Sequence, residues 1–147
     1  MAKTYYEPMH TAEHILNQTM LQFHTEKRSF TTHIEKKKSK VDYHFTRNLN
    51  EEELKKIESR VNEIIKKNLD VSEKFISRQD AESKFNLERL PEDVGDKIRI
   101  IQVGDYDACP CIGQHVSNTS EIGEFKIVSS SFDNGVLRIR FKLLSVD

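Results

Sequence analysis

Two short stretches of this chain, separated by about a hundred residues, each hold a pair of good metal ligands. The first stretch is His10–His14 (HTAEH) and the second is Cys111–His115 (CIGQH). In both, the two ligands are four residues apart, a spacing that brings side chains to one face of a helix. Zinc takes nitrogen and sulfur ligands in a tetrahedral shell. The sequence therefore predicts one Zn²⁺ site made of His10, His14, Cys111 and His115.

Neither pair is specific by itself, because an HxxxH pair also occurs on ordinary solvated helix faces. The chain contains only six histidines and two cysteines, so two matched pairs among so few residues favour a shared metal site. The two cysteines, Cys109 and Cys111, are too close in sequence for an unstrained disulfide. They indicate a reducing, cytoplasmic environment.

The composition is typical of a globular protein with a heavily charged surface, since 32% of the 147 residues are charged and 36% are hydrophobic. This length allows one domain with a core, over residues 1–147. No more than two apolar residues are ever adjacent, so neither a membrane-spanning helix nor a secretory leader is expected. The first six residues, MAKTYY, do not resemble a signal peptide.

The net charge of −1 hides an uneven distribution. Between Lys27 and Arg47 there are seven basic residues and two acidic ones. Such a cluster can contact phosphates, and it can equally be a solvated hairpin tip, which composition alone favours. The lysines at its centre are Lys36, Lys37, Lys38 and Lys40.

The first half of the chain predicts two helices and a hairpin. His10–His24 is expected to be helical after Pro8, which suits a first helical turn. Residues 29–35 and 40–47 alternate as two strands joined by the lysine-rich turn. Asn50 and Glu53 form a capping box in front of a helix with apolar residues every three or four positions.

The second half predicts mainly strands. Strands are expected at 71–76, 97–103, 123–131 and 136–144, the last two joined by the tight turn Asp133-Asn134-Gly135. A short helix is expected at Asp80–Leu87, a loop around Pro91 and Gly95, and a loop from Gly104 to Cys109 leading into the CIGQH stretch. Hairpins mixed with helices predict an α+β domain with a largely antiparallel sheet.

The order of these pieces resembles the editing domain of alanyl-tRNA synthetase, and more closely the small free-standing AlaX proteins that carry this domain alone. The matching segments are HTAEHIL at 10–16, the helix from Ile57 to Asn68, Val103-Gly104-Asp105-Tyr106, and CIGQHVSNTSEIG at 111–123. The resemblance covers almost the whole chain. It implies a zinc-dependent deacylase that acts in trans on mischarged tRNA, with Ser-tRNA(Ala) or Gly-tRNA(Ala) as the expected substrate. With this partner implied, the candidates for contact with the tRNA backbone are Lys36, Lys37, Lys38 and Lys40.

Two segments depart from the family pattern. The family places glycine after the cysteine and threonine before the final histidine, where this chain has Ile112 and Gln114. Its synthetase members carry a Q-x-G-S-like segment where this chain reads Phe30-Thr31-Thr32-His33. Both segments line the aminoacyl pocket in the family. The candidates for contact with the amino acid are therefore Thr31, Thr32 and Gln114, although Thr31 and Thr32 can equally be outward-facing strand threonines.

Two other functions compete with the deacylase. HTAEH also spells H-x-x-E-H, the inverted zinc-peptidase motif, in which Glu13 would be the general base. That motif needs a later acidic ligand and leaves Cys111 and His115 without a role, so the deacylase interpretation treats Glu13 as an ordinary exposed helix residue. The third possibility is a zinc-stapled module that binds tRNA without cleaving an ester.

Overall fold

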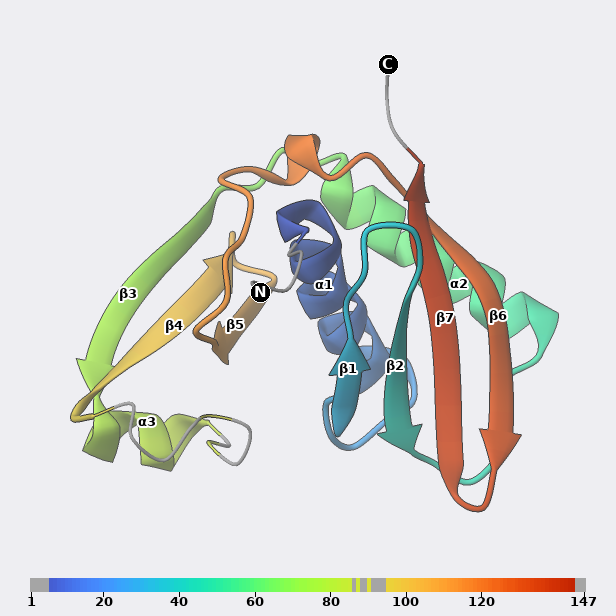
Figure 1. The fold of residues 1–147 in the computed structure, drawn as a ribbon, viewed down its shortest axis with the longest axis horizontal. Coiled ribbons are helices and arrows are strands. Elements are labelled where there is room, and N and C mark those ends of the chain that lie inside the picture. The colour runs from blue at the N-terminus through green and yellow to red at the C-terminus, as the bar shows by residue number, and fades with distance from the viewer. Residues whose placement is uncertain (1–5, 86, 88–89, 91–94, 145–147) are drawn as a thin grey trace.

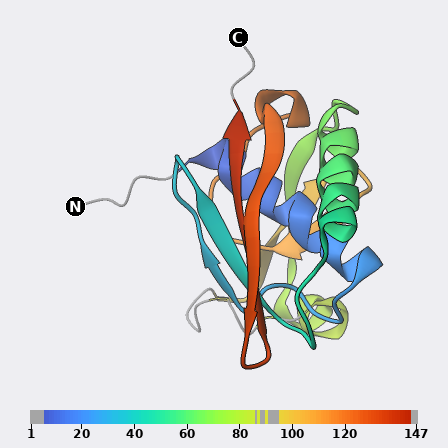
Figure 2. The ribbon, with the colours of Figure 1, turned by 90° about the vertical axis from the view of Figure 1, so that its right-hand side faces the viewer.

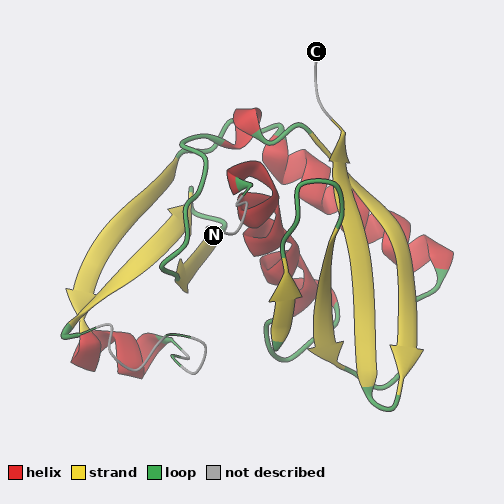
Figure 3. Cartoon of the chain, in the orientation of Figure 1, coloured by secondary structure: helices red, strands yellow, loops and turns green. Residues whose placement is uncertain are grey.

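Helix α1 (Glu7–Phe23) runs between two antiparallel sheets (Figure 1). The computed structural model describes residues 6–85, 87, 90 and 95–144. The larger sheet has the strand order β1 (Thr31–His33), β2 (Ser39–His44), β7 (Val136–Leu144), β6 (Glu124–Asp133). The smaller sheet has the order β3 (Val71–Ser77), β4 (Lys97–Val103), β5 (Asp107–Pro110). Figure 3 shows the two sheets splayed apart around α1.

Helix α1 is enclosed on all sides, unlike the half-exposed helices of most small domains. Every residue from Met9 to Asn17 is buried, polar and apolar alike. Its apolar side chains share one core with α2 (Glu51–Ile65) and with the inner face of the larger sheet. The polar side chains of α1 must therefore find partners inside the protein.

Helix α2 begins where the sequence predicted. The Asn50 side chain accepts a hydrogen bond of 2.8 Å from the Glu53 amide, and the Glu53 carboxylate accepts one of 2.9 Å from the Asn50 amide. The predicted capping box is thus confirmed, and the apolar positions Ile57, Val61 and Ile64 are buried.

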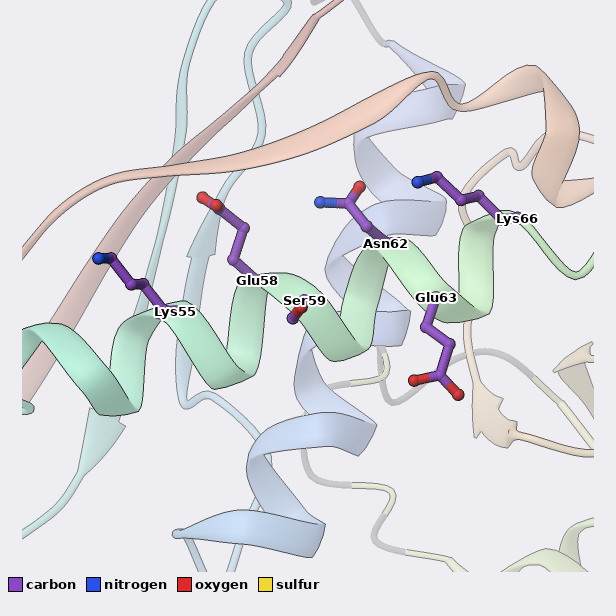
Figure 4. Close-up of a pocket in the computed structure, with 6 residues that line it drawn as sticks. All are labelled: Lys55, Glu58, Ser59, Asn62, Glu63 and Lys66. Carbon is purple, nitrogen blue, oxygen red and sulfur yellow. The ribbon is translucent and has the colours of Figure 1, made fainter.

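Side chains of α2 also protect the free edge of the larger sheet. Asn62 donates to the Phe125 carbonyl and accepts from the Phe125 amide, both at 2.8 Å, and Glu58 accepts from the Ile127 amide at 2.7 Å. Figure 4 shows Asn62 and Glu58 on the side of α2 that faces β6. The edge strand is thereby paired rather than left open to another chain. The hollow of about 650 Å³ drawn there is lined by Lys55, Glu58, Ser59, Asn62, Glu63 and Lys66.

The predicted strands and hairpins are present with small shifts of their ends. Asn134 and Gly135, the two turn residues between β6 and β7, both have positive φ, which is the geometry of a tight hairpin turn. The short helix lies at Arg78–Lys84 (α3), two residues earlier than its predicted start. The predicted loop residue Pro91 and residues 1–5 lie outside the described residues, whereas Gly95 is in a loop.

One prediction near the second ligand pair was wrong, and the second pair itself does not lie on a helix. The region from Gly104 to Cys109 is not a continuous loop, because Asp107–Pro110 forms β5 and pairs with β4. The CIGQH stretch is not helical but an irregular loop between β5 and the short 3₁₀ helix η1 (Thr119–Glu121). A four-residue strand ending in proline has too little alternation to be recognised from sequence.

The predicted fold class is confirmed, since the described residues form a single α+β domain with antiparallel sheets. Among the described helices, none has the length and apolar character needed to cross a membrane.

The role of Asn62 in pairing the edge strand β6 can be tested by substitution. Replacing it by alanine leaves the Phe125 amide and carbonyl without partners, so we expect Asn62→Ala to lower the free energy of unfolding by about 1–3 kcal/mol. Urea unfolding followed by circular dichroism measures this loss. Glu63→Ala is the control on the same helix, because the Glu63 side chain is 57% exposed in an ion pair with Arg60. Equal stability of the two variants would contradict the role given to Asn62.

Candidate metal centre

The four predicted ligands meet at one point. His10 and His14 lie one turn apart on α1, and Cys111 and His115 lie on the loop that follows β5. One donor atom from each residue can be chosen so that all four lie within 4.8 Å of one another. The three imidazole centroids are 4.1 to 4.9 Å apart. The two pairs, far apart in sequence, therefore form a single cluster that can hold a metal ion.

Arg99 of β4 fixes the shape of the ligand loop. One guanidinium nitrogen, Nη1, donates to the Cys111 carbonyl at 3.1 Å and to the Gly113 carbonyl at 2.6 Å. The Cys111 amide returns a hydrogen bond of 3.2 Å to the Arg99 carbonyl. Because these carbonyls are turned toward Arg99, the loop keeps its irregular shape without helical hydrogen bonds.

The orientation of the His10 ring follows from its contact with the ligand loop. Its Nδ1 lies 3.1 Å from the backbone carbonyl of Gln114. A carbonyl only accepts, so Nδ1 carries the proton and Nε2 keeps its lone pair. Nε2 lies 3.5 Å from the Cys111 sulfur, on the side where the other donors gather.

Thr11 plays the corresponding part for His115. Its hydroxyl donates to the Glu7 carbonyl at 3.2 Å and lies 3.0 Å from the His115 Nδ1, which must then be the donor. The His115 Nε2 is buried and makes no hydrogen bond within the described part of the chain. Burial is the main cause that lowers the pKa of His115 to about 4, so the ring is neutral at pH 7. A neutral ring with a buried, unpaired Nε2 is suited to metal ligation.

A carboxylate faces the third imidazole. The His14 Nδ1 is 3.6 Å from Asp107 Oδ2, and Asp107 in turn accepts hydrogen bonds of 2.8 and 3.2 Å from Arg28 and 3.0 Å from Gln18. Burial alone would raise the pKa of Asp107, but the contacts with His14 and Arg28 outweigh it and hold the pKa below its usual range. Asp107 is therefore an anion that orients the His14 ring.

The same carboxylate changes the protonation of His14. Burial lowers the pKa of His14, but the contacts with Asp107 and Cys111 outweigh burial and raise the pKa to about 9. A metal ion at the His14 Nε2 would therefore displace a proton at neutral pH.

The two cysteines differ in chemical character. Burial is the main cause that raises the pKa of Cys109 to about 12, which keeps it a thiol. Burial raises the pKa of Cys111, but the contacts of its sulfur with the imidazoles of His10, His115 and His14 outweigh burial and lower the pKa to about 3. Only Cys111 is thus poised as a thiolate, the form that binds metals.

Glu13 is not the exposed residue that the sequence interpretation expected. It is 5% exposed, and its Oε1 lies 3.8 Å from the His10 Nε2 and 4.0 Å from the His14 Nε2. Its other oxygen accepts a hydrogen bond from the Asn17 side chain. The expectation was wrong because it assumed a solvated face on a helix that is enclosed on all sides.

A hydrogen-bond chain connects Glu13 with one of the two candidate threonines. Asn17 accepts from the Ser29 amide at 2.8 Å, and the Ser29 hydroxyl lies 2.9 Å from the Thr32 hydroxyl. Thr32 therefore belongs to the same polar network as the metal cluster. Thr31 points to the opposite face of β1, where it donates to Asp42 at 2.6 Å.

The remaining predicted residues lie at the surface. The Gln114 side chain is exposed, and only its carbonyl contacts the cluster. Lys36, Lys37 and Lys38 are exposed on the loop between β1 and β2, and Lys40 is half-buried on β2. Sequence reasoning missed the residues that orient the imidazoles, namely Thr11, Arg28 and Asp107.

Comparison with known proteins gives a consistent family. Residues 98–140 match the family described as the threonyl and alanyl tRNA synthetase second additional domain. The alanine--tRNA ligase of Ligilactobacillus salivarius (strain UCC118) is 37% identical over 134 residues, which is 88% of this chain and 15% of that protein. The alanine--tRNA ligase of Methanopyrus kandleri is 36% identical over 106 residues, 70% of this chain and 12% of that protein.

A third similar protein, the alanine--tRNA ligase of Thermoanaerobacter sp. (strain X514), is 35% identical over 136 residues, again 88% of this chain and 15% of the relative. The chain thus spans about one seventh of the length of the curated relatives it matches. The match to residues 98–140 contains the CIGQH loop, and the longer alignments extend over most of the domain. The chain therefore belongs with the editing-related domain of the alanyl-tRNA synthetases.

Proposed function

We propose that this domain hydrolyses the ester bond between tRNA and a wrongly attached amino acid, as the AlaX proteins do. The expected substrates are Ser-tRNA(Ala) and Gly-tRNA(Ala). The observation that supports the proposal is the cluster of His10, His14, His115 and Cys111, whose donor atoms lie within 4.8 Å of one another, while each imidazole Nδ1 faces an oxygen.

The donor set favours zinc. His10, His14, Cys111 and His115 supply three nitrogens and one sulfur, which is a common zinc combination. The oxygens behind the rings are the usual outer partners of metal-bound histidine, and here they are the Gln114 carbonyl, the Thr11 hydroxyl and the Asp107 carboxylate. A bound zinc ion would supply a positive charge that orients the substrate or polarises its carbonyl.

The need for such a reaction follows from the limits of recognition. A pocket built for alanine cannot strongly reject glycine, which is smaller, or serine, which adds one hydroxyl. A second site that hydrolyses these products removes the errors. Water adds to the ester carbonyl, the bond to the ribose oxygen breaks, and the free amino acid and tRNA leave.

Within the site, Thr32 is the better placed of the two candidate threonines for a seryl hydroxyl. Its hydroxyl lies in the network that runs through Ser29 and Asn17 to Glu13. Thr31 already donates to Asp42 on the other face of the strand. Gln114 stays a candidate through its exposed side chain.

Contact with tRNA is proposed for Lys36, Lys37, Lys38 and Lys40. The Lys36 ammonium lies 5.9 Å from the centre of the Tyr6 ring, and the Tyr6 carbonyl accepts from the His10 amide. Lys36 thus reaches the side chain of a residue whose backbone lies about one helical turn before the first ligand, His10.

The first prediction concerns the metal itself. We expect one Zn²⁺ per chain, lost for the most part in Cys111→Ala, because Cys111 is the thiolate donor of the cluster. Cys109→Ala is the matched control, since burial keeps Cys109 protonated. Elemental analysis after dialysis against a weak chelator measures zinc per chain. Equal zinc in both variants would show that the cluster is not the binding site.

A second prediction concerns the carboxylate behind His14. Asp107→Asn removes the charge that orients the ring, and we expect metal affinity to fall by about 10- to 100-fold. Competition with a chromophoric chelator measures the Kd, and the absorption spectrum of the Co²⁺-substituted protein reports the geometry. Asp105→Asn, an exposed acid two residues away, should leave both unchanged. An unaltered Kd in Asp107→Asn would remove Asp107 from the metal centre.

The third prediction tests the reaction and separates it from a peptidase. Purified protein should deacylate Ser-tRNA or Gly-tRNA in preference to Ala-tRNA and Thr-tRNA, and His14→Ala should abolish this activity. Glu13→Gln keeps an oxygen facing Asn17, so we expect a change of less than about tenfold in single-turnover rate, whereas loss of a general base costs about 100-fold or more.

This comparison of rates requires that the Glu13→Gln variant binds as much zinc as the unmodified protein. A collapse of Ser-tRNA hydrolysis in this variant with its zinc intact would make Glu13 the base. Binding of tRNA without cleavage of any of the four esters would favour a purely binding module.

A further inference from the structure

The larger sheet has one face packed on the core and one face turned away from it. Val41, Tyr43, Leu137, Ile139 and Phe141 point inward and pack with the helices. The strands alternate, so the residues between these positions lie on the opposite, outer face. Figure 2 shows this sheet nearly edge-on, with both long helices on its inner side.

The outer face gathers cations from three strands. Cross-strand register places Lys40 of β2 opposite Arg140 of β7, and Lys142 of β7 opposite Lys126 of β6. Neighbouring strands are about 5 Å apart and alternate residues of one strand about 7 Å apart. These four cations therefore form a dense patch, which we call the basic sheet face.

The basic sheet face continues into the lysine loop. Lys36, Lys37 and Lys38 precede β2 at the end of the sheet where β7 finishes and β6 begins (Figure 1). The nearby acids are Glu35, which contacts His33 at 3.2 Å, and Glu124. With Arg138 and Asp42, which also lie on this face, eight cations are set against three carboxylates in a chain whose net charge is −1.

The pairing of the four cations on the sheet is unfavourable by itself. Like charges directly opposite each other destabilise an antiparallel pair, and here two such pairs occur side by side. Among the described residues, no carboxylate lies within ion-pair distance of Lys40, Lys126, Arg140 or Lys142. By contrast, the neighbouring Arg138 is neutralised by Asp42 through hydrogen bonds of 2.7 and 3.0 Å. A bound polyanion would offset the repulsion that the protein leaves unbalanced.

We propose that the basic sheet face and the lysine loop together bind the sugar-phosphate backbone of the RNA substrate. This inference rests on the proposed function, because that function supplies an RNA partner. Charge complementarity supports this proposal, because the successive phosphates of an RNA strand match rows of Lys and Arg side chains that have no carboxylate partner among the described residues. The contact of Lys36 with Tyr6, next to the first turn of α1, connects the lysine loop, though not the outer face of the sheet, with the helix that carries His10 and His14.

The chemistry of the face favours RNA over a membrane surface. Proteins that lie on bilayers combine cations with apolar side chains that enter the lipid. Beside Arg140 and Arg138 the outer face carries Ser129 and Ser131 of β6, and the exposed apolar residue Leu144 lies at its end, opposite Glu124. Small hydroxyl side chains between cations suit phosphate and ribose oxygens.

The test compares two variants that each lose three positive charges. The sheet variant is Lys126→Gln, Arg140→Gln, Lys142→Gln. The control variant is Lys55→Gln, Lys56→Gln, Lys66→Gln, whose cations are exposed on or just after α2. Fluorescence anisotropy with uncharged tRNA gives the Kd over a series of salt concentrations, with anionic phospholipid vesicles as the alternative ligand.

We expect the sheet variant to bind tRNA about tenfold or more weakly at about 0.1 M salt, with a slope of log K against log salt smaller by about two. The control should keep the Kd and slope of the unmodified protein. Removing the like-charge pairs should also leave the thermal midpoint of the sheet variant at low salt equal to or above that of the unmodified protein, which shows that it folds.

An unchanged Kd and slope in the sheet variant would overturn the inference, and so would loss of vesicle binding without loss of tRNA binding. The tRNA-binding result can be told apart from the result of the deacylation assay. If the unmodified protein deacylates Ser-tRNA but the sheet variant binds normally, only the surface is wrong. If the sheet variant loses tRNA binding while no ester is ever cleaved, the surface stands and the proposed reaction fails.

Discussion

The complete enclosure of α1 is the constraint on which the rest of this structure depends. A helix buried from Met9 to Asn17 cannot leave its polar side chains to water, so each needs an internal partner. The imidazoles of His10 and His14, the Thr11 hydroxyl and the Glu13 carboxylate are all such side chains. Their partners come from the ligand loop, from β5 and from the segment before β1. The polar cluster and the packing of the two sheets on α1 therefore form together.

This arrangement explains why the outer oxygens matter as much as the four donors. Burial would penalise charge on any of these groups, yet Asp107 and Cys111 are held as anions by the cations and imidazoles around them. Arg28 supplies the compensating charge for Asp107, with two hydrogen bonds to the carboxylate. Such a site is already oriented before any ion arrives, which lowers the cost of binding one.

The sequence predicted the features that are encoded locally. The capping box at Asn50 and the tight turn at Asn134-Gly135 are decided by residues a few positions apart, and both are present. The ligand set His10, His14, Cys111 and His115 was also within reach, because scarce residue types recurred at a matched spacing. The family resemblance rested on the same segments and is supported by the relatives.

The features that sequence reasoning missed all depend on contacts between distant segments. Glu13 seemed exposed because its neighbours on α1 are polar, and only the closing of two sheets around the helix buries it. Asp107 and Arg28 are separated by 79 residues and gave no pattern to recognise. The CIGQH loop has helical spacing but not helical structure, because the hydrogen bonds from Arg99 hold its carbonyls in another direction. The i, i+4 spacing thus selected four residues that do lie together, but helical geometry explains this for only one of the two pairs.

The basic sheet face is a surface feature that also depends on contacts between distant segments. Lys36 to Lys40 is visible as a cluster in the sequence, and taken alone it is as well explained by a solvated turn. Lys126, Arg140 and Lys142 look like ordinary polar positions in alternating strands. The strand register places Arg140 opposite Lys40 and Lys142 opposite Lys126, so that single charges become pairs that repel each other. Like-charge pairs without a carboxylate partner are a cost that folding alone does not explain in a protein with a net charge of −1, and a polyanion bound across the sheet would offset it.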